Sequence, residues 1–441
     1  MKYKTKPLTA GRIIILSFLA VVIIGAILLM LPISSKERVF TPFLDALFTS
    51  TSATCVTGLI VHDTATYWSL FGQIVILILV QIGGMGVVTL AVAISSIAGR
   101  KIGLMQRSTM QESIAAPHVG GMVRLTRYIL KVIFITEAVG AAVMAPVFCR
   151  DFGLGKGIWY AVFHSITAFC NAGFDLMGVN QQYSSLTYYS SNILINVVIM
   201  LLVILGGIGF LTWNDVQTNG IHFKRYKMQT KVILVTSGLL ILLPTIFFFF
   251  VEFTHMPVKE RILASLFQAV SPRTAGFNTA DLTAISESGL VIMSLLMLIG
   301  GSPGSTAGGF KTTTFAVLIA SAMSVYRKKE NAEIFKRRID NSVVKKASAI
   351  LILFLTMLTG GTAFISLYEG IPFTDSLFEV ASAIGTVGLT VGITPGLSTP
   401  SHIMLIIMMF AGRVGSLTLF FAAVSNKKNN AKLPLEDITV G

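Results

Sequence analysis

Four short segments of the sequence place a glycine after two residues that are mostly small or β-branched, and follow it with leucine or phenylalanine. They read S-A-T-C-V-T-G-L, T-A-F-C-N-A-G-F, V-S-P-R-T-A-G-F and S-A-I-G-T-V-G-L. Successive copies lie 115, 103 and 112 residues apart, so one pattern recurs four times at a nearly constant period. The four glycines are Gly58, Gly173, Gly276 and Gly388.

The chemistry that such segments can perform is coordination of a cation by backbone oxygen. A cation that has lost its hydration shell needs replacement oxygen ligands, and consecutive carbonyl groups supply them when they turn toward one axis. This turn needs uncommon dihedral angles, positive φ among them, which glycine adopts without a Cβ clash. Four segments around one axis would complete a ring. We therefore predict an ion-binding filter formed by Val56, Thr57, Gly58, Asn171, Ala172, Gly173, Thr274, Ala275, Gly276, Thr386, Val387 and Gly388.

A second glycine pattern follows each of these segments, in an apolar stretch. It reads I-G-G-M-G, L-G-G-I-G, I-G-G-S-P-G and A-G-R-V-G. One glycine of each copy serves as its reference position, and these reference glycines lie 26, 34, 25 and 24 residues after the segment glycines. Two interpretations stay open, because these glycines either serve the ion path or let neighbouring helices pack closely in a membrane. Recurrence of both patterns in step predicts a fourfold internal repeat. The reference glycines are Gly84, Gly207, Gly301 and Gly412.

The composition indicates a membrane protein. Hydrophobic residues make up 54% of the 441 residues and charged residues only 12%, whereas about a quarter of a typical soluble domain is charged. Eight apolar stretches are long enough to cross a bilayer, which takes about 20 residues. They are 11–33, 70–98, 124–148, 190–215, 231–253, 288–325, 345–368 and 402–425. The glycine segments lie in four shorter stretches, interpreted as re-entrant: 42–60, 158–175, 260–278 and 374–392.

The expected fold is therefore an all-α membrane protein with eight transmembrane helices, arranged as four pseudo-symmetric span–pore-loop–span repeats around one pore. The basic residues give its orientation, because 25 of the 34 Lys and Arg residues lie on the side predicted to hold the N-terminus. The positive-inside rule then puts both termini of a cell-membrane protein in the cytoplasm. The four repeats are expected at 1–100, 101–219, 220–326 and 327–441, the last with a cytoplasmic tail.

The net charge of +14 follows from this topology rather than from nucleic-acid binding, because no basic stretch is interleaved with stacking aromatic residues. The densest basic loop, 327–338, is expected to contact anionic lipid or an acidic partner. The apolar run 13–31 is longer than a signal-peptide core and has no A-x-A site, so we interpret it as a retained first span.

The sixth apolar stretch is interrupted by G-G-S-P-G-S-T-A-G-G-F-K-T-T-T, residues 300–314. A proline and five glycines disfavour a regular helix, and irregular backbone at membrane depth is tolerated where it lines a cavity. A phosphate-binding loop does not fit, because Phe310 separates the last glycine from Lys311. Lys311 either approaches the ion path or reaches the cytoplasmic interface. Arg413, in the last span, lies too deep for that interface and is expected to face a wet cavity.

The four span–loop–span units, the single glycine in each loop and the broken sixth span together resemble the Trk/Ktr/HKT superfamily of potassium transporters, and most of all its KtrB-type membrane subunits. The resemblance covers nearly the whole chain. It implies a K⁺-translocating subunit that works as a homodimer, with no cofactor in this chain, and a cytosolic ring of nucleotide-binding, KtrA-like regulatory subunits. It also implies a gate below the filter, formed by Gly300, Gly301, Gly304, Gly308, Gly309, Lys311 and Arg413.

Two features depart from a strict potassium filter. Arg273 lies three residues before Gly276, where its charge would repel K⁺, and we expect it to turn behind the filter and pair with the acid Glu379. Each segment also lacks the second glycine of potassium channels, so the ring is expected to discriminate less strictly between K⁺ and Na⁺.

Two other classes of function have less support. A carrier that couples an ion to a small organic solute would need buried carboxylates and inverted repeats, and Glu137 is the single mid-span candidate. An enzyme would need a reactive constellation, but the six histidines are scattered without metal spacing, and the three cysteines have neither metal nor disulfide spacing. We therefore expect no catalytic residues.

Overall fold

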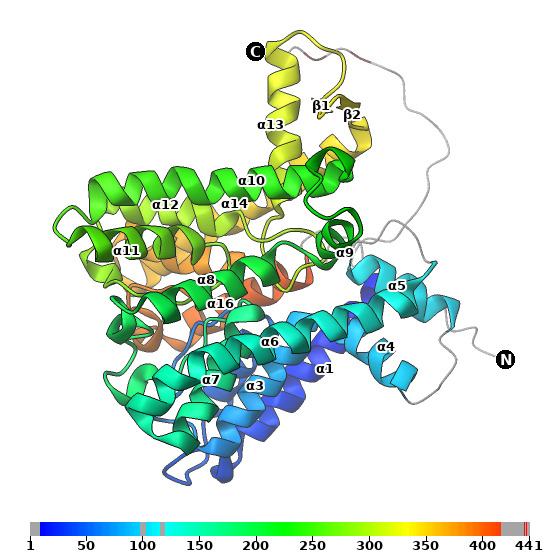
Figure 1. The fold of residues 1–441 in the computed structure, drawn as a ribbon. Helices are drawn as coiled ribbons and strands as arrows, with labels where there is room; N and C mark the ends of the chain where they lie inside the picture. Colours follow the sequence, from blue (N-terminus) through cyan, green and yellow to red (C-terminus); the bar gives the residue numbers. More distant parts are fainter. Residues whose placement is uncertain (1–8, 98–102, 115–119, 416–435, 437, 439–441) are drawn as a thin grey trace.

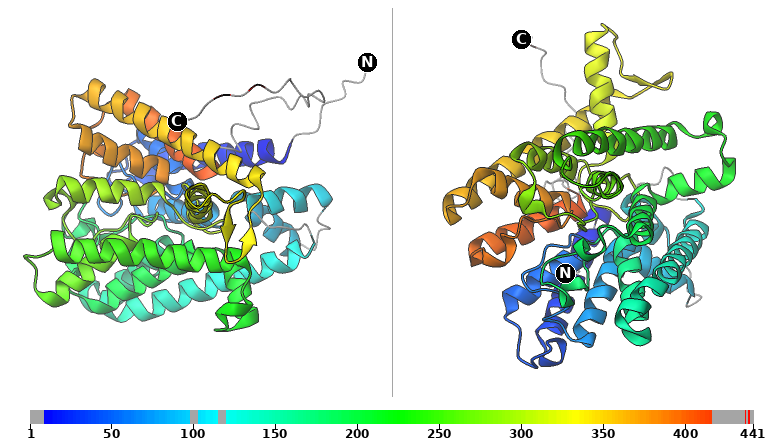
Figure 2. Two further views of the ribbon diagram at one scale, coloured as in Figure 1. Left: turned by 90° about the horizontal axis from the view of Figure 1, so that it is seen from above. Right: turned by 60° about the vertical axis from the view of Figure 1, so that its left-hand side comes forward.

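The computed structural model describes residues 9–97, 103–114, 120–415, 436 and 438. Within these residues nearly every regular element is a helix, and the sheet found there is a hairpin of two-residue strands, β1 (Glu333–Ile334) and β2 (Arg337–Arg338). The longer helices run roughly side by side through the body, while α13 and the hairpin project from it (Figure 1). The right-hand view of Figure 2 shows the same projection from another side.

Four helices of the described part are long and apolar enough to cross a membrane by themselves. They match the first, third, fifth and seventh apolar stretches of the sequence. Large apolar side chains on their outer faces are well exposed, as expected of surfaces that contact lipid; Ile24, Val139, Leu243 and Ile352 are examples. The helices are α1 (Ala10–Met30), α6 (Met122–Phe152), α10 (Met228–Phe247, followed by a π-helical turn to Glu252) and α14 (Asn341–Glu369).

The second, fourth and sixth apolar stretches are each divided into two helices, whereas the sequence predicted an interruption in the sixth alone. The divisions of the second and fourth stretches were therefore not predicted. The eighth stretch forms a helix up to Val414, and its predicted end at 425 lies outside the described residues. The pairs are α3 (Leu70–Met85) with α4 (Val87–Ile97), α8 (Ile193–Gly207) with α9 (Phe210–Asn219), and α12 (Glu287–Leu298) with α13 (Thr312–Tyr326); the last helix is α16 (Thr399–Val414).

Glycines with positive φ cause three of these helix ends. The φ angles of Gly86, Gly209 and Gly415 are 82°, 90° and 92°, which side chains with a Cβ rarely adopt. At Gly209 the axes of α8 and α9 meet at 97°. Hydropathy continues across each glycine, so the apolar pattern of the sequence does not reveal the break.

Four short helices lead into the glycine segments. Three of them begin directly after a proline, which fits a helix start because it lacks the N–H that the first turn leaves unpaired. The same three carry an acidic residue in the first turn, where it interacts favourably with the helix dipole; these residues are Asp45, Glu260 and Asp375. The four helices are α2 (Phe43–Thr54), α7 (Leu154–Phe169), α11 (Val258–Val270) and α15 (Phe373–Gly385).

The remaining described elements connect these helices. α5 (Leu104–Ser113) packs against α1 and α4. Single 3₁₀ turns occupy Pro32–Ser34, Met177–Val179, Thr187–Tyr189, Phe223–Arg225, Leu282–Ala284 and Thr394–Gly396.

Helices α3, α8 and α16 each press a glycine against the last turn of a short helix. A Cβ added to Gly83, Gly206 or Gly412 would lie closer than 3.0 Å to a backbone carbonyl oxygen, a distance that real Cβ atoms essentially never reach. The three carbonyl groups belong to residues that each precede a segment glycine by four positions: Thr54, Phe169 and Ile384. This geometry supports the close-packing interpretation of the second glycine pattern.

We expect Gly83→Ala to lower the thermal midpoint of the detergent-solubilised protein, because overpacking of a well-packed site costs about 1–3 kcal/mol. Gly360→Ala is the matched control: Gly360 lies in the membrane helix α14, and no atom lies within 4 Å of its added Cβ. Its midpoint should stay unchanged or rise slightly. Equal midpoints for the two variants, measured by size exclusion after heating, would contradict the packing assignment.

Candidate ion-binding site

The four segment glycines lie together and form a closed ring. A Cβ added to any of them would lie closer than 3.0 Å to a backbone atom of another segment. The segments follow one another around the ring in chain order, and the last one contacts the first. The contacts are Gly58 with Ala172, Gly173 with Gly276, Gly276 with Val387, and Gly388 with Thr57.

Each segment has the same alternating backbone conformation. The glycine has a positive φ, and so does the residue two positions before it. For β-branched residues this conformation is strained, at a cost of about 1–3 kcal/mol each, and it persists only where the surroundings enforce it. The sequence predicted positive φ for the glycines but not for these residues, which are Val56 (59°), Asn171 (58°), Thr274 (72°) and Thr386 (53°).

Hydrogen bonds turn the N–H groups of the segments back toward the short helices. The N–H groups of Thr57, Ala172 and Val387 each donate to a carbonyl five residues earlier, at 2.8 Å. In the third segment the N–H of Ala275 donates to Ser271, at 2.9 Å. No hydrogen bond within the described part of the chain reaches the carbonyl oxygens of these four residues. Carbonyl oxygens without a donor from the described residues are therefore gathered at the ring, as a cation site built from backbone oxygen requires.

Arg273 does not pair with Glu379, so this prediction was wrong. Its guanidinium group donates to Ser237 Oγ of α10 at 3.0 Å, and the residue is buried. The Glu379 carboxylate instead accepts hydrogen bonds from Thr390 Oγ1, at 2.7 Å, and from Thr394 Oγ1. The two side chains diverge because each is held by its own neighbourhood: Arg273 by the membrane helix behind the third segment, Glu379 by the loop that follows the fourth.

A cavity of 360 Å³ adjoins the ring, and all four segment glycines line it. Asp175 and Asp281 contribute carboxylates to its wall, and none of the described residues that line it is lysine or arginine. Such a wall attracts cations. Burial raises the pKa of Asp175 to about 7, and the nearby carboxylate of Asp63 acts in the same direction.

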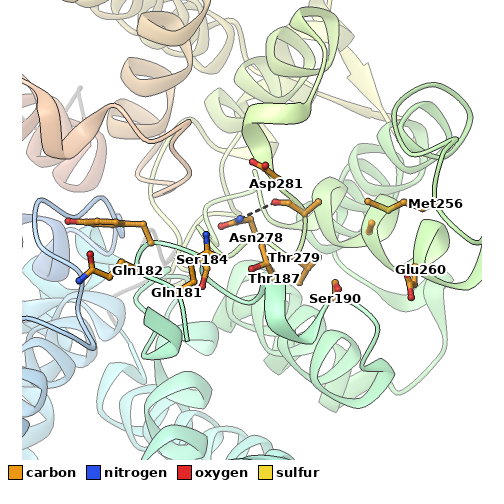
Figure 3. A pocket seen from close by; sticks show the side chains of 13 residues that line it. Gln181, Gln182, Ser184, Thr187, Ser190, Met256, Glu260, Asn278, Thr279 and Asp281 are labelled. Carbon is orange, nitrogen blue, oxygen red and sulfur yellow. Dashed lines mark hydrogen bonds between the residues drawn. The ribbon is translucent and has the colours of Figure 1, made fainter. Parts of the chain in front are cut away.

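A second pocket, of 390 Å³, lies beside this cavity and is drawn in Figure 3. It shares Tyr183, Asn278 and Asp281 with the cavity. The Asn278 side chain donates to the carbonyl oxygen of Ala280 at 3.0 Å, which is the dashed line in Figure 3. The pocket therefore extends the polar surface beside the ring without touching the four glycines.

The predicted gate residues of the sixth stretch lie directly against the segments. The Thr306 hydroxyl shares its one proton between the carbonyl oxygen of Phe169, at 3.0 Å, and Asn171 Oδ1, at 3.2 Å. A Cβ added to Gly308 would lie closer than 3.0 Å to Thr386 Oγ1. Asn171 Nδ2 also donates to Thr274 Oγ1 at 3.3 Å. The Asn171 side chain thus connects the second and third segments to the irregular loop. The sequence did not predict these contacts.

Backbone hydrogen bonds fix the irregular loop, residues 299–311, between three helices. They connect it to the ends of α8 and α9, to α16 and across its own base. The sequence-predicted members Gly300, Gly301, Gly304, Gly308 and Gly309 all lie in this loop. The bonds are Ser302 N to Gly207 O (2.9 Å), Phe210 N to Gly304 O (2.8 Å), Gly309 N to Gly412 O (3.3 Å) and Gly300 N to Phe310 O (2.8 Å).

Two basic side chains, those of Lys311 and Arg413, donate hydrogen bonds to carbonyl groups of this loop. Lys311 Nζ donates to the carbonyls of Ala307 and Gly308, at 2.8 and 3.0 Å, rather than extending to the interface. The Arg413 guanidinium group donates to the carbonyls of Thr306 and Gly83, and more weakly, at 3.4 Å, to that of Gly84. Lys311 and Arg413 both line a further cavity, of 310 Å³, together with residues of the loop and of α3 and α16.

The long apolar helices, together with the broken helices and the closed ring of glycine segments, are features of a multi-pass membrane protein. The chain belongs to the TrkH family of cation transport proteins, whose model matches residues 3–432. This family is one of transporters, not enzymes.

Relatives of similar length support this assignment. The chain is 38% identical to the Ktr system potassium uptake protein B of Bacillus subtilis, with 98% of this chain and 97% of the relative covered. It is 36% identical to the potassium/sodium uptake protein NtpJ of Enterococcus hirae, with 99% and 98% covered. The crystal structure of the potassium transporter TrkH from Vibrio parahaemolyticus has the same fold, with a TM-score of 0.75 and 19% identity over 96% of this chain and 86% of that one.

We expect the half-saturating Rb⁺ concentration for uptake into proteoliposomes to rise about threefold when the pH on both sides falls from 8 to 6. A pKa of about 7 means that Asp175 is protonated as the pH falls through this range, and the attraction of one carboxylate charge in the cavity wall for a cation is worth roughly that factor in water. Asp175→Asn should give the pH 6 value at both pH values. Asp281→Asn is the control and should keep the pH dependence, since it leaves Asp175 in place.

Proposed function

We propose that this chain is the K⁺-translocating membrane subunit of a potassium uptake system, and that it conducts ions passively through a filter of backbone carbonyls. The proposal rests on the closed ring of four glycines, in which the glycine of every segment and the residue two positions before it have a positive φ. The names of relatives that are 36–38% identical over nearly the whole chain support potassium as the ion.

We infer that the four segments belong to four pseudo-symmetric repeats with eight spans around one pore, with boundaries near 100, 219 and 326. The recurring contact between a helix glycine and the carbonyl four residues before a segment glycine supports this arrangement in three of the repeats. The distribution of Lys and Arg supports cytoplasmic termini. A location in the cell membrane follows from uptake as the function.

In the proposed mechanism, a hydrated cation collects in the acidic cavity beside Asp175 and Asp281. It then loses water to the carbonyls of Thr57, Ala172 and their counterparts, which replace the hydration shell. Each strained residue two positions before a glycine keeps a carbonyl turned toward the axis. Since oxygen ligands are presented without reorganisation, the ion crosses the ring at little additional cost.

We further propose that residues 299–311 form the gate below this filter. Closed, the loop blocks the path between the ring and the cavity beside Arg413. Opening requires the hydrogen bonds from Thr306 to Phe169 and Asn171 to break. The positive charges of Arg413 and Lys311 repel a second cation and so disfavour its binding nearby. Glycine-rich backbone suits this movement, because it can exchange conformations without side-chain clashes.

The proposed assembly is a homodimer whose pores are regulated by a cytosolic, KtrA-like ring of nucleotide-binding subunits. The chain itself is expected to bind no nucleotide and no cofactor besides the transported ion. Membership of a named Ktr system among the relatives supports a multi-component system. The basic loop at 327–338 is the expected contact for anionic lipid.

We expect Gly276→Ser to reduce discrimination between K⁺ and Na⁺ about tenfold, the equivalent of about 1.4 kcal/mol. Gly276 has a φ of 79°, and its added Cβ would meet the Val387 carbonyl. Gly392→Ser is the matched control, because Gly392 has a similar φ of 96° but open space around its Cβ. Rubidium uptake with Na⁺ as competitor measures the effect; unchanged competition in Gly276→Ser would oppose the filter assignment.

We expect Thr306→Val to increase Rb⁺ uptake in the absence of regulatory subunits about fivefold, because the hydrogen bond that the Thr306 hydroxyl shares between two acceptors, worth about 0.5–1.5 kcal/mol, would be lost from the closed loop. Thr356→Val on the exposed face of α14 removes only a bond to its own helix and should have no effect. A loop shortened between Gly304 and Gly309 should leak more strongly still. A Thr306→Val protein that stayed as closed as the unmodified one would sink the gate assignment.

A further inference from the structure

A buried carboxyl group lies behind the second filter segment and has no part in the mechanism above. Glu137 occupies the middle of α6 and is 5% exposed. Both of its oxygens accept hydrogen bonds from Gln81 Nε2 of α3, at 3.0 and 3.3 Å. No ion pair involves Glu137 in the described part of the chain. A group of this kind within a membrane is costly and therefore indicates a specific role.

Glu137 and Gln81 meet the thiol of Cys170. Cys170 Sγ lies 3.6 Å from Gln81 Oε1 and 3.9 Å from Glu137 Oε1, and its single S–H is shared between these two acceptors. Gly84 provides the space, because its added Cβ would lie 2.6 Å from this sulfur. Three side chains from α3, α6 and the end of α7 thus form one polar cluster, which we call the Glu137 cluster.

The Glu137 cluster holds the residue at which the second segment begins. Cys170 is the C-cap of α7 and directly precedes Asn171, whose φ is 58°. Asn171 in turn contacts Thr274 of the third segment and Thr306 of the gate loop. A shift of Cys170 would therefore reach the filter and the gate through a single residue.

Packing alone does not require a carboxyl group at this position. Ser165 Oγ of α7 donates to the backbone oxygen of Glu137 at 2.7 Å. The first segment has the same contact, in which Ser50 Oγ of α2 donates to the backbone oxygen of Val22 at 2.7 Å. Val22 is apolar and buried. Since valine suffices behind the first segment, the acid behind the second has a function that valine lacks.

We propose that Glu137 is a positioning residue: as a hydrogen-bond acceptor it fixes Cys170, and thereby sets the orientation of Asn171 that determines ion discrimination at the second segment. The inference rests on the proposed filter. It assigns Glu137 no ion to bind or couple, which separates it from the role that a carrier would require.

Rubidium uptake with Na⁺ as competitor tests this role in proteoliposomes of the full-length protein. Glu137→Leu should weaken discrimination against Na⁺ about tenfold, and Gly84→Ala should do the same by displacing the thiol. Glu137→Gln keeps an acceptor oxygen and should remain within about twofold of the unmodified protein. Val22→Leu, a packing change at the corresponding site behind the first segment, is the matched control and should leave discrimination unchanged.

The outcomes separate the two proposals. If the unmodified protein transports neither K⁺ nor Rb⁺, the proposed function fails. If it transports them but Glu137→Leu and Gly84→Ala discriminate normally, the positioning role alone is overturned. Loss of uptake in both Glu137→Gln and Glu137→Leu would also overturn it, because the carboxyl group itself would then be required. The discrimination ratio does not depend on how much protein folds, so a poorly folding variant still gives a reading.

Discussion

The backbone carbonyl groups at the ring of glycine segments that receive no hydrogen bond from the described residues are the constraint on which the rest of this structure depends. Such groups are tolerated only where they line a wet cavity or bind an ion. Much of the described fold maintains this arrangement: the short helices end at the ring, and glycines such as Gly83 let neighbouring helices approach their final turns. Residues such as Val56 have a strained backbone conformation, which persists only because the surrounding structure enforces it.

The irregular loop between α12 and α13 obeys the same constraint by a different solution. Its backbone groups find partners in α8, α9 and α16, so the loop is ordered although it forms no helix of its own. Arg413 contributes by donating to carbonyls of both the loop and α3. A guanidinium group whose donors are satisfied by main-chain oxygen needs no acidic partner, which explains how Arg413 is accommodated without an ion pair among the described residues.

The sequence was most informative where one residue type has one physical use. The spacing of four glycines was enough to predict segments that come together, and apolar length was enough for α1, α6, α10 and α14. It was less informative where the outcome depends on a neighbour far along the chain. The breaks at Gly86 and Gly209 are invisible to hydropathy, because apolar residues continue on both sides. The partners of Arg273 and Asn171 are set by tertiary packing, so charge complementarity suggested Glu379 where the structure has a serine on α10.

All four quarters of the ring come from one polypeptide, and they are not copies of each other. In an assembly of identical subunits every substitution is imposed four times, so a coordinating site can change only symmetrically. Here the second segment has Asn171 at the position where the fourth has Thr386. A substitution at either position changes one segment while the other three keep the geometry of the ring. If the ring acts as the proposed filter, it can acquire an intermediate preference between two similar ions in small steps, each of which alters a single ligand group.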